Sequence, residues 1–211
     1  MTEIYLVRHP ETEHNINPSI VSGRSNSVPL TQRGYTQARE FSEAFSRIYP
    51  TPDAIYSSPA LRTRTLAQIY IEQNRLTLPV TIDDALQEMS QGIAEGCDRS
   101  LVYTPEVIKR IDQELFDFKH PEGESLNDVS TRMLGSIWRM HDSYPDQAII
   151  AFTHGQAIRR AVGKLLGWNH FETTQDPTKT TPNVSVTHLS TSDKDITVHY
   201  MGRTIIPETE L

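Results

Sequence analysis

The stretch EIYLVRHPETEHN (residues 3–15) begins with a short apolar run that ends at Arg8 and His9. Aromatic and β-branched residues in such a run favour a buried strand. A charged side chain at the edge of a core is costly to desolvate unless it meets a partner. The stretch therefore predicts a strand with a functional group at its carboxyl end, and it places Pro10 directly behind that group.

Strand-like segments alternate with amphipathic helices along the rest of the chain. Strands are expected at residues 3–9, 53–58, 78–83, 147–154, 183–190 and 195–201, and helices at 30–48, from Pro59 onward, and at 104–118, 124–140 and 155–167. The expected N-caps are Thr31, Ser58, Thr104 and Ser125, the last in a capping box with Asp128. This alternation predicts an α/β fold, a three-layer α/β/α sandwich with a mostly parallel central sheet. With 211 residues and no linker, we expect one domain over residues 1–211.

Composition narrows the class of protein. The formal charge of −7 argues against a nucleic-acid partner, which normally requires a basic surface, but a few local arginines can still bind a small anion. No apolar run has the length of a membrane span, and the N-terminus lacks the pattern of a secretory signal, so no membrane partner is expected. One cysteine, Cys97, is consistent with a cytoplasmic protein. The oligomeric state is left open.

Polar residues follow three of the predicted strands. In a mostly parallel sheet, ligands bind in the crevice at the carboxyl ends of the strands, so these groups should converge there. They are Arg8 with His9, Ser57 and Ser58 leading to Arg62, and Thr153 with His154.

These residue types suit phosphoryl chemistry. A histidine at a strand end can be a nucleophile, a general base, a metal ligand or a structural group. Arginine can hold two phosphoryl oxygens at once and stays charged, as Arg8 and Arg62 would. No metal is expected, because His9 and His14 lack metal-ligand spacing and no acidic cluster flanks them.

Several segments, in order, resemble the histidine phosphatase superfamily, the phosphoglycerate mutase-like group. They are LVRHPETEHN (6–15), SG (22–23), PLTQRGYTQA (29–38), YSSPALRTRTLA (56–67), LQEMSQGIAEG (86–96), PEGES (121–125), AFTHG (151–155) and NVSVTHL (183–189). Each piece alone is weak, but their common order over almost the whole chain is specific.

The resemblance implies a site and a reaction. His9 would attack phosphorus and form a phosphohistidine that water then hydrolyses, and Glu88 would protonate the leaving oxygen. The phosphoryl group would be held by Arg8, Asn15, Arg62, His154 and Gly155, with Ser22 and Gly23 nearer the rest of the substrate. The substrate would be a small phosphorylated molecule, and no cofactor is expected.

Two alternatives stay open. Cofactor-dependent mutases of this family typically carry a longer segment before the second histidine, whereas residues 96–121 are short here and predict one helix. That favours a phosphatase over a mutase. A non-catalytic phosphate-binding module is the other alternative, because Pro10 replaces the family's glycine next to the nucleophile. Proline fixes φ near −65° and removes an N–H.

Overall fold

Six strands form one sheet in the computed structural model, which describes residues 1–17 and 19–206. The strands are β1 (Thr2–Arg8), β2 (Ala54–Ser57), β3 (Val80–Ile82), β4 (Ala148–Thr153), β5 (Val186–Thr191) and β6 (Ile196–Arg203). Their order is β3-β2-β4-β1-β5-β6. β3, β2, β4 and β1 are parallel neighbours, and β5 and β6 complete the sheet in antiparallel pairing. The sheet is mostly parallel, as predicted.

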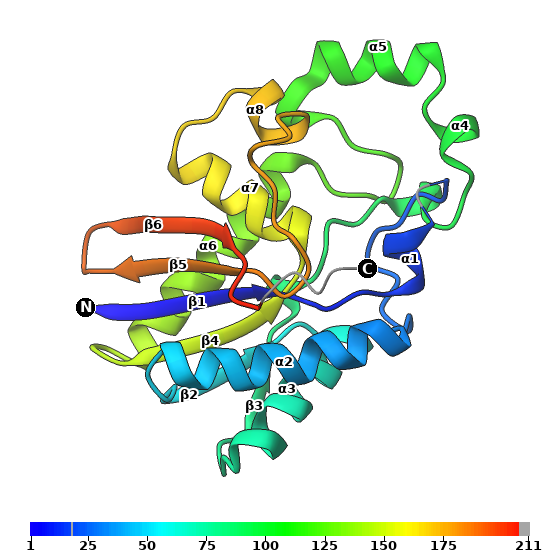
Figure 1. Ribbon diagram of the computed structural model, residues 1–211. Helices are drawn as coiled ribbons and strands as arrows, with labels where there is room; N and C mark the ends of the chain where they lie inside the picture. The colour runs from blue at the N-terminus through cyan, green and yellow to red at the C-terminus, as the bar shows by residue number, and fades with distance from the viewer. Residues whose placement is uncertain (18, 207–211) are drawn as a thin grey trace.

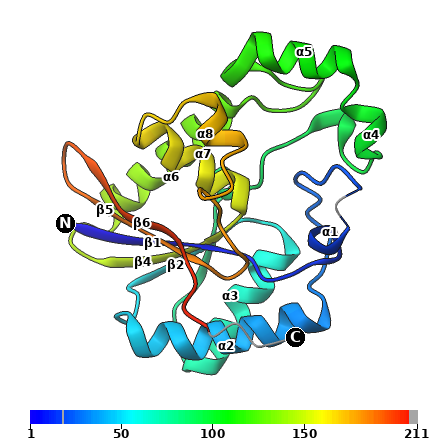
Figure 2. The same ribbon diagram turned by 45° about the horizontal axis from the view of Figure 1, so that its top comes forward.

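Helices cover both faces of this sheet (Figures 1 and 2). They are α1 (Glu13–Ile16), α2 (Gln32–Ile48), α3 (Leu61–Asn74), α4 (Arg99–Val102), α5 (Pro105–Glu114), α6 (Leu126–Ser143), α7 (Gly155–Leu165) and α8 (His170–Thr174). Short 3₁₀ turns lie at Asp84–Leu86, Gly92–Ala94 and Leu115–Asp117. None of the helices in the described ranges is long and apolar enough to cross a membrane.

Alternate residues of each central strand enter two separate cores. On one face, Ile4 and Leu6 of β1 pack with residues of α6 and α7. On the other face, Tyr5 and Val7 pack with residues of α2 and α3. This period of two is what a strand buried on both sides requires. The predicted three-layer α/β/α sandwich is therefore confirmed.

The helix starts follow the sequence signals at three of the four expected caps. Thr31 accepts a hydrogen bond from the Gly34 amide at 3.0 Å, and Thr104 and the Ser125–Asp128 box cap α5 and α6 in the same way. Each such cap contributes about 1 kcal/mol. The expected cap at Ser58 is wrong, because α3 begins two residues after Pro59 and the Ser58 hydroxyl instead contacts His154.

The segment between residues 96 and 121 differs from the single helix expected there. It forms two helices, α4 and α5, followed by a 3₁₀ turn. None of the residues of α5 is buried. The apolar residues Ile111 of α5, Leu115 and Phe118 instead line a cavity. In Figure 1, α5 lies at the opposite side of the molecule from α2 and α3, beyond α7 and α8.

Candidate active site

The carboxyl ends of β1, β2 and β4 meet where the sequence predicted. The backbone amide of His9 donates to the Thr153 carbonyl oxygen at 3.0 Å, and the Ser58 amide donates to Phe152 at 2.9 Å. These bonds bring the imidazole rings of His9 and His154 to a centroid separation of 5.2 Å. Parallel pairing of neighbouring strands is thus enough to join polar groups that are far apart in the sequence.

A cavity of about 550 Å³ opens at this edge of the sheet. Of the nine residues predicted for the site, seven line it: Arg8, His9, Asn15, Ser22, Gly23, Arg62 and Glu88. His154 is completely buried and lies behind the cavity wall, in contact with Arg62. Gly155, the first residue of α7, also lies outside the lining and packs beside Arg8.

His9 is buried and neutral. Its Nδ1 lies 2.6 Å from the carbonyl oxygen of Pro10, which can only accept, so Nδ1 carries the proton. Burial lowers the pKa of His9 well below 6.5, and the charges of Arg62 and Arg8 lower it further. The lone pair of Nε2 is therefore available at neutral pH. Pro10 contributes to this arrangement through its carbonyl group, which any residue would supply.

His154 is held by two partners. The Arg62 guanidinium donates to Nδ1 at 3.0 Å, so the proton of the neutral ring sits on Nε2, which donates to the Ser58 hydroxyl at 2.8 Å. Burial lowers the pKa of His154 well below 6.5, followed by the charges of Arg62 and His9. His154 thus fixes the position of Arg62 in the resting structure.

Arg62 and Arg8 are two of the cationic residues that line the cavity. Arg62 donates to the carbonyl oxygens of Ser25 and Arg24 at 2.8 and 2.9 Å, and burial lowers its pKa to about 10, where it stays charged at neutral pH. Arg8 donates to the Thr181 carbonyl oxygen at 2.6 Å, while its Nε is buried without a hydrogen-bond partner. Both guanidinium groups are bonded to carbonyl oxygens and form no ion pair within 4.0 Å in the described residues.

Gly155 and Asn15, two further residues predicted for the site, each have a close neighbour. A Cβ on Gly155 would lie 3.1 Å from Nε of Arg8, so glycine leaves room for that side chain. The Oδ1 atom of Asn15 accepts from the amide of Thr12 at 3.0 Å. Because the amide oxygen is engaged there, the amino group of Asn15 is the end suited to a phosphoryl oxygen.

Glu88 rests on the N-terminus of α7. Its Oε1 accepts from the amides of Met89 and Ala157, both at 2.9 Å, and its Oε2 accepts from the amide of Gln156 at 3.1 Å. The first turn of a helix has amides with no partner inside the helix, and a carboxylate satisfies them. The same helix that follows His154 therefore also positions Glu88.

The loop with Ser22 and Gly23 is tied down by Glu95. The Glu95 carboxylate accepts from the amides of Arg24 and Gln91 at 3.1 and 3.0 Å. Gly23 has φ of +136°, and a Cβ there would lie 2.5 Å from the Glu95 carboxyl group. Glu95 thus holds the loop in place, and Gly23 is required by its backbone angle and by this contact.

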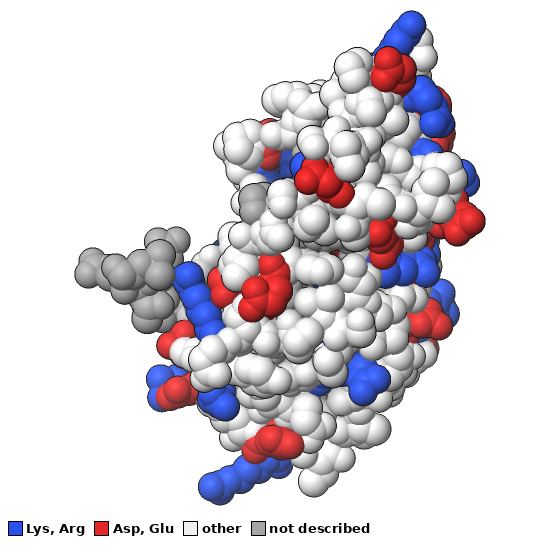
Figure 3. Space-filling model, turned by 90° about the vertical axis from the view of Figure 1, so that its right-hand side faces the viewer, with Lys and Arg blue, Asp and Glu red and all other residues white. Residues whose placement is uncertain are grey.

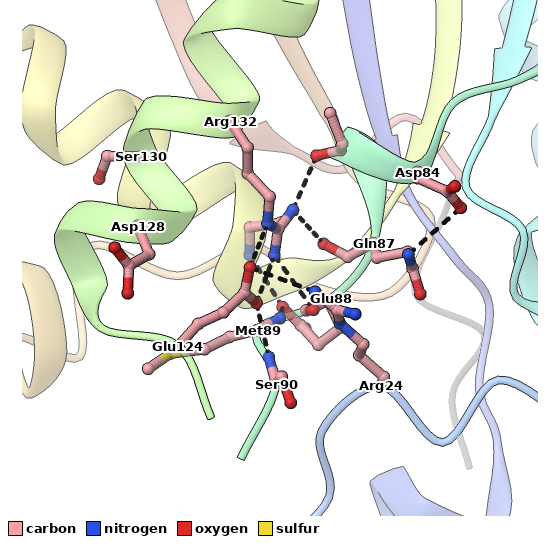
Figure 4. Close-up of polar contacts among 12 residues, drawn as sticks. Arg24, Asp84, Gln87, Glu88, Met89, Ser90, Glu124, Asp128, Ser130 and Arg132 are labelled. Carbon is pink, nitrogen blue, oxygen red and sulfur yellow. Dashed lines mark hydrogen bonds and ion pairs between the residues drawn. The ribbon is translucent and has the colours of Figure 1, made fainter. Parts of the chain in front are cut away.

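Sequence analysis did not identify Arg132 of α6, which organises the segment before and around Glu88. Arg132 donates to the carbonyl oxygens of Ala85, Gln87 and Glu88 at 2.7, 2.8 and 3.1 Å, and to both carboxylate oxygens of Glu124 (Figure 4). Glu124 in turn accepts from the Ser90 amide at 2.8 Å. No local sequence signal distinguishes Arg132 from other charged residues of an amphipathic helix.

Acidic and basic side chains are interspersed on the face of the molecule seen in Figure 3.

In the described part of the chain, one group of side chains is arranged so that it could hold a metal ion: Glu3, His188 and His199, on β1, β5 and β6. None of the three lines the cavity. The positive charge in the cavity comes instead from arginine and lysine side chains.

Comparison with known proteins identifies the family. A profile of the histidine phosphatase superfamily (branch 1) matches residues 4–204, so the chain belongs to this superfamily of enzymes, as its sequence motifs indicated. The chain is 30% identical over 167 residues to an uncharacterized phosphatase, PhoE, of Bacillus subtilis (strain 168), covering 79% of each chain. It is 32% identical over 171 residues to a probable phosphoglycerate mutase, GpmB, of Cronobacter sakazakii (strain ATCC BAA-894), covering 79% of this chain and 76% of that protein.

A solved structure has the same fold. YhfR of Bacillus stearothermophilus superposes with a TM-score of 0.82 at 22% identity, covering 97% of this chain and 98% of that one. The shared architecture extends over nearly the whole chain, which includes the strand ends that carry the candidate site.

Proposed function

We propose that this chain hydrolyses small phosphomonoesters through a phosphohistidine formed on His9. The observation that carries the proposal is the 2.6 Å contact between Nδ1 of His9 and the Pro10 carbonyl oxygen. It leaves Nε2 as the basic nitrogen of a buried, neutral ring, which is the form that an attacking imidazole must have. The relative named as a phosphatase supports the same reaction class.

In the first step, Nε2 of His9 forms a bond to phosphorus while the bond from phosphorus to the leaving oxygen breaks. Arg8, Arg62 and Asn15 bind the phosphoryl oxygens as charge develops on them. His154 acts here as a positioning residue as well as a phosphate neighbour, because its Nδ1 accepts from Arg62 at 3.0 Å.

Glu88 delivers the proton that the leaving oxygen needs. Of its two oxygens, Oε2 accepts one backbone hydrogen bond and Oε1 accepts two, so Oε2 is the better placed to carry the proton. In the second step, water attacks the phosphohistidine, its proton passes to Glu88, and inorganic phosphate leaves. Arginine supplies the positive charge in both steps.

A mutase is the second candidate, favoured by the 32% identity to a probable phosphoglycerate mutase. It would pass the phosphoryl group from His9 to a second hydroxyl group instead of water. The measurement that separates the two is the ratio of phosphate release to interconversion of 2- and 3-phosphoglycerate. A phosphatase releases phosphate faster.

We also propose a cytoplasmic location, since a chain with one cysteine, Cys97, forms no internal disulfide.

The decisive experiment is turnover of a panel of phosphomonoesters in the presence of a chelator, measured for the wild-type protein and for His9→Ala. We expect acid-labile phosphate on the wild-type protein during turnover, and neither label nor turnover in His9→Ala. His199→Ala, which changes a histidine on β6 that does not line the cavity, is the matched control. Undiminished turnover by His9→Ala would refute the mechanism. Phosphate binding without turnover by the wild type would identify a non-catalytic binding module.

A further inference from the structure

Two arginines of the cavity lack a full set of hydrogen-bond partners. In the described residues, four arginines have a buried Nε atom with no partner; Arg8 and Arg160 line the cavity, whereas Arg24 and Arg159 do not. A buried N–H group without an acceptor costs free energy, which a ligand that accepts from the same guanidinium can offset. For Arg8 that ligand is the phosphoryl group of the proposed reaction. Arg160 has no role in that reaction.

Arg160 is a buried cation without a counterion. It lies on α7, is 6% exposed, and donates through one terminal nitrogen to the Thr173 carbonyl oxygen. No ion pair within 4.0 Å joins it to an acidic residue among residues 1–17 and 19–206. Burial and then the charge of Arg159 lower the pKa of Arg160 to about 10, so it is charged at neutral pH.

In the described residues, the acidic side chains of the cavity form no ion pair within 4.0 Å with Arg160, and only the charge of Glu88 acts on it from a distance by raising its pKa. Other groups hold these carboxylates. Glu88 accepts three backbone hydrogen bonds. Glu124 accepts from Nε and Nη2 of Arg132 and from the Ser90 amide. The cavity thus retains a second positive centre beside the one at Arg8.

We propose that Arg160 binds a second anionic group, an oxyanion on the leaving group of the substrate. This inference rests on the proposed phosphatase activity. Gln156 lies one helical turn before Arg160 on the same face of α7. His170 of α8 is near enough for the charge of Arg160 to lower its pKa, and both Gln156 and His170 line the cavity. Their amide and imidazole N–H groups are suited to the remaining oxygens of a carboxylate or phosphate.

The spacing of residues along α7 gives an expected length for the substrate. The guanidinium of Arg8 lies beside Gly155, at the first turn of the helix. Arg160 is five residues further on, which corresponds to about 7.5 Å along the helix axis. A substrate that reaches both arginines therefore needs several bonds between its phosphorus and its second anionic group.

The test compares matched esters of increasing chain length. Each ω-carboxyalkyl phosphate is paired with the alkyl phosphate of equal length, and an α,ω-alkane bisphosphate series distinguishes a carboxylate from a phosphate as the preferred oxyanion. At the best length, we expect kcat/KM of wild type to favour the anionic ester by about 10- to 100-fold, as for a hydrogen bond to a charged group. Arg160→Gln should bring this ratio near one, and Arg160→Lys should keep part of it. Lys194→Met, which removes an exposed cation in the turn between β5 and β6 that does not line the cavity, is the matched control and should keep the wild-type ratio.

The outcomes separate this inference from the proposed reaction. A wild-type ratio near one at every length, or an unchanged ratio in Arg160→Gln, overturns the second anion site even if the esters are hydrolysed. If Arg160→Gln does not fold, the proposal is tested by the ratio of wild type and by that of Arg160→Lys. A wild-type ratio near one, or an unchanged ratio in Arg160→Lys, then overturns it. If no ester is hydrolysed, the proposed reaction fails, and calorimetry with the corresponding phosphonates measures the same ratio as relative affinity.

Discussion

Replacing Arg132 by methionine should loosen the segment that carries Glu88. Methionine keeps most of the length of the side chain but removes every donor. The change would remove the donor from the carbonyl oxygens of Ala85, Gln87 and Glu88. It would also leave Glu124 with only the Ser90 amide and Arg24 as partners. Glu124 would remain as a partly buried carboxylate without its main partner.

The cost follows from the burial of this pair. The side chains of Arg132 and Glu124 are 17% and 16% exposed, so the pair is largely shielded from water. Removing one partner of a buried ion pair costs about 3–5 kcal/mol. Because Arg24 also lies 3.2 Å from Glu124 and can compensate in part, we expect a loss near the lower end, about 3 kcal/mol.

Urea unfolding measures this loss as a change in midpoint at constant slope. Glu124→Met and the double variant complete a double-mutant cycle with Arg132→Met. The double variant leaves no unpaired carboxylate, so it should lose less stability than the two single variants together. This cycle separates the ion pair from the hydrogen bonds to the loop carbonyl groups.

Activity provides a second measurement, the ratio of turnover between two kinds of ester. A general loss of stability would lower turnover of both esters equally and leave this ratio unchanged. A 4-nitrophenyl ester has a good leaving group that needs no proton, whereas in the proposed mechanism an alkyl ester needs the proton from Glu88. General acid catalysis contributes roughly 10²- to 10⁴-fold. Displacing Glu88 should therefore reduce turnover of alkyl esters at least about tenfold more than turnover of 4-nitrophenyl phosphate, which is part of that full contribution. An equal loss for both esters, or a stability loss below about 1 kcal/mol, would refute a positioning role for Arg132.

Three further predictions follow from the site. Burial lowers the pKa values of His9 and His154 below the 6.5 of the unfolded chain, so the unfolded state binds more protons at acidic pH. The free energy of unfolding should therefore fall as pH drops below about 6.5, by up to about 2.7 kcal/mol per pH unit for the two residues together. Denaturant titrations at several pH values measure this fall. Stability independent of pH between 7 and 5 would contradict the buried neutral rings. Pro10→Gly should change turnover only modestly, because the carbonyl group at position 10 persists, and should lower the free energy of unfolding by about 0.4–1 kcal/mol through chain entropy; a large gain in turnover would show that proline impairs the native enzyme. Gly23→Ala should cost about 1–3 kcal/mol in thermal unfolding, since φ is +136° and its Cβ would meet the Glu95 carboxyl group; a neutral effect would rule out this strain.

Local signals in the sequence predicted the features that depend on local chemistry. Thr31, Thr104 and Ser125 are caps because a side-chain oxygen can reach amides three residues away. The strand ends with His9 and His154 were predictable because parallel strands place their carboxyl ends together.

The remaining features depend on tertiary contacts. Ser58 has the pattern of a cap, but its hydroxyl accepts from His154, which is distant in sequence. Arg132 and Arg160 resemble other polar residues of their helices, and only packing against the Glu88 segment and the cavity distinguishes them. The catalytic and binding roles assigned to individual residues stay predictions until the variants above are measured.

The place of β1 in the sheet has a consequence for synthesis of the protein. β1 is translated first, yet its two neighbours are β4 and β5, which begin at Ala148 and Val186. At about 5–20 residues per second, roughly 10–40 s separate β1 from the end of β5 on the ribosome. During that interval the apolar strand that precedes His9 has neither partner. Nascent chains should therefore need protection from aggregation, and the candidate site should form only after most of the chain has been made.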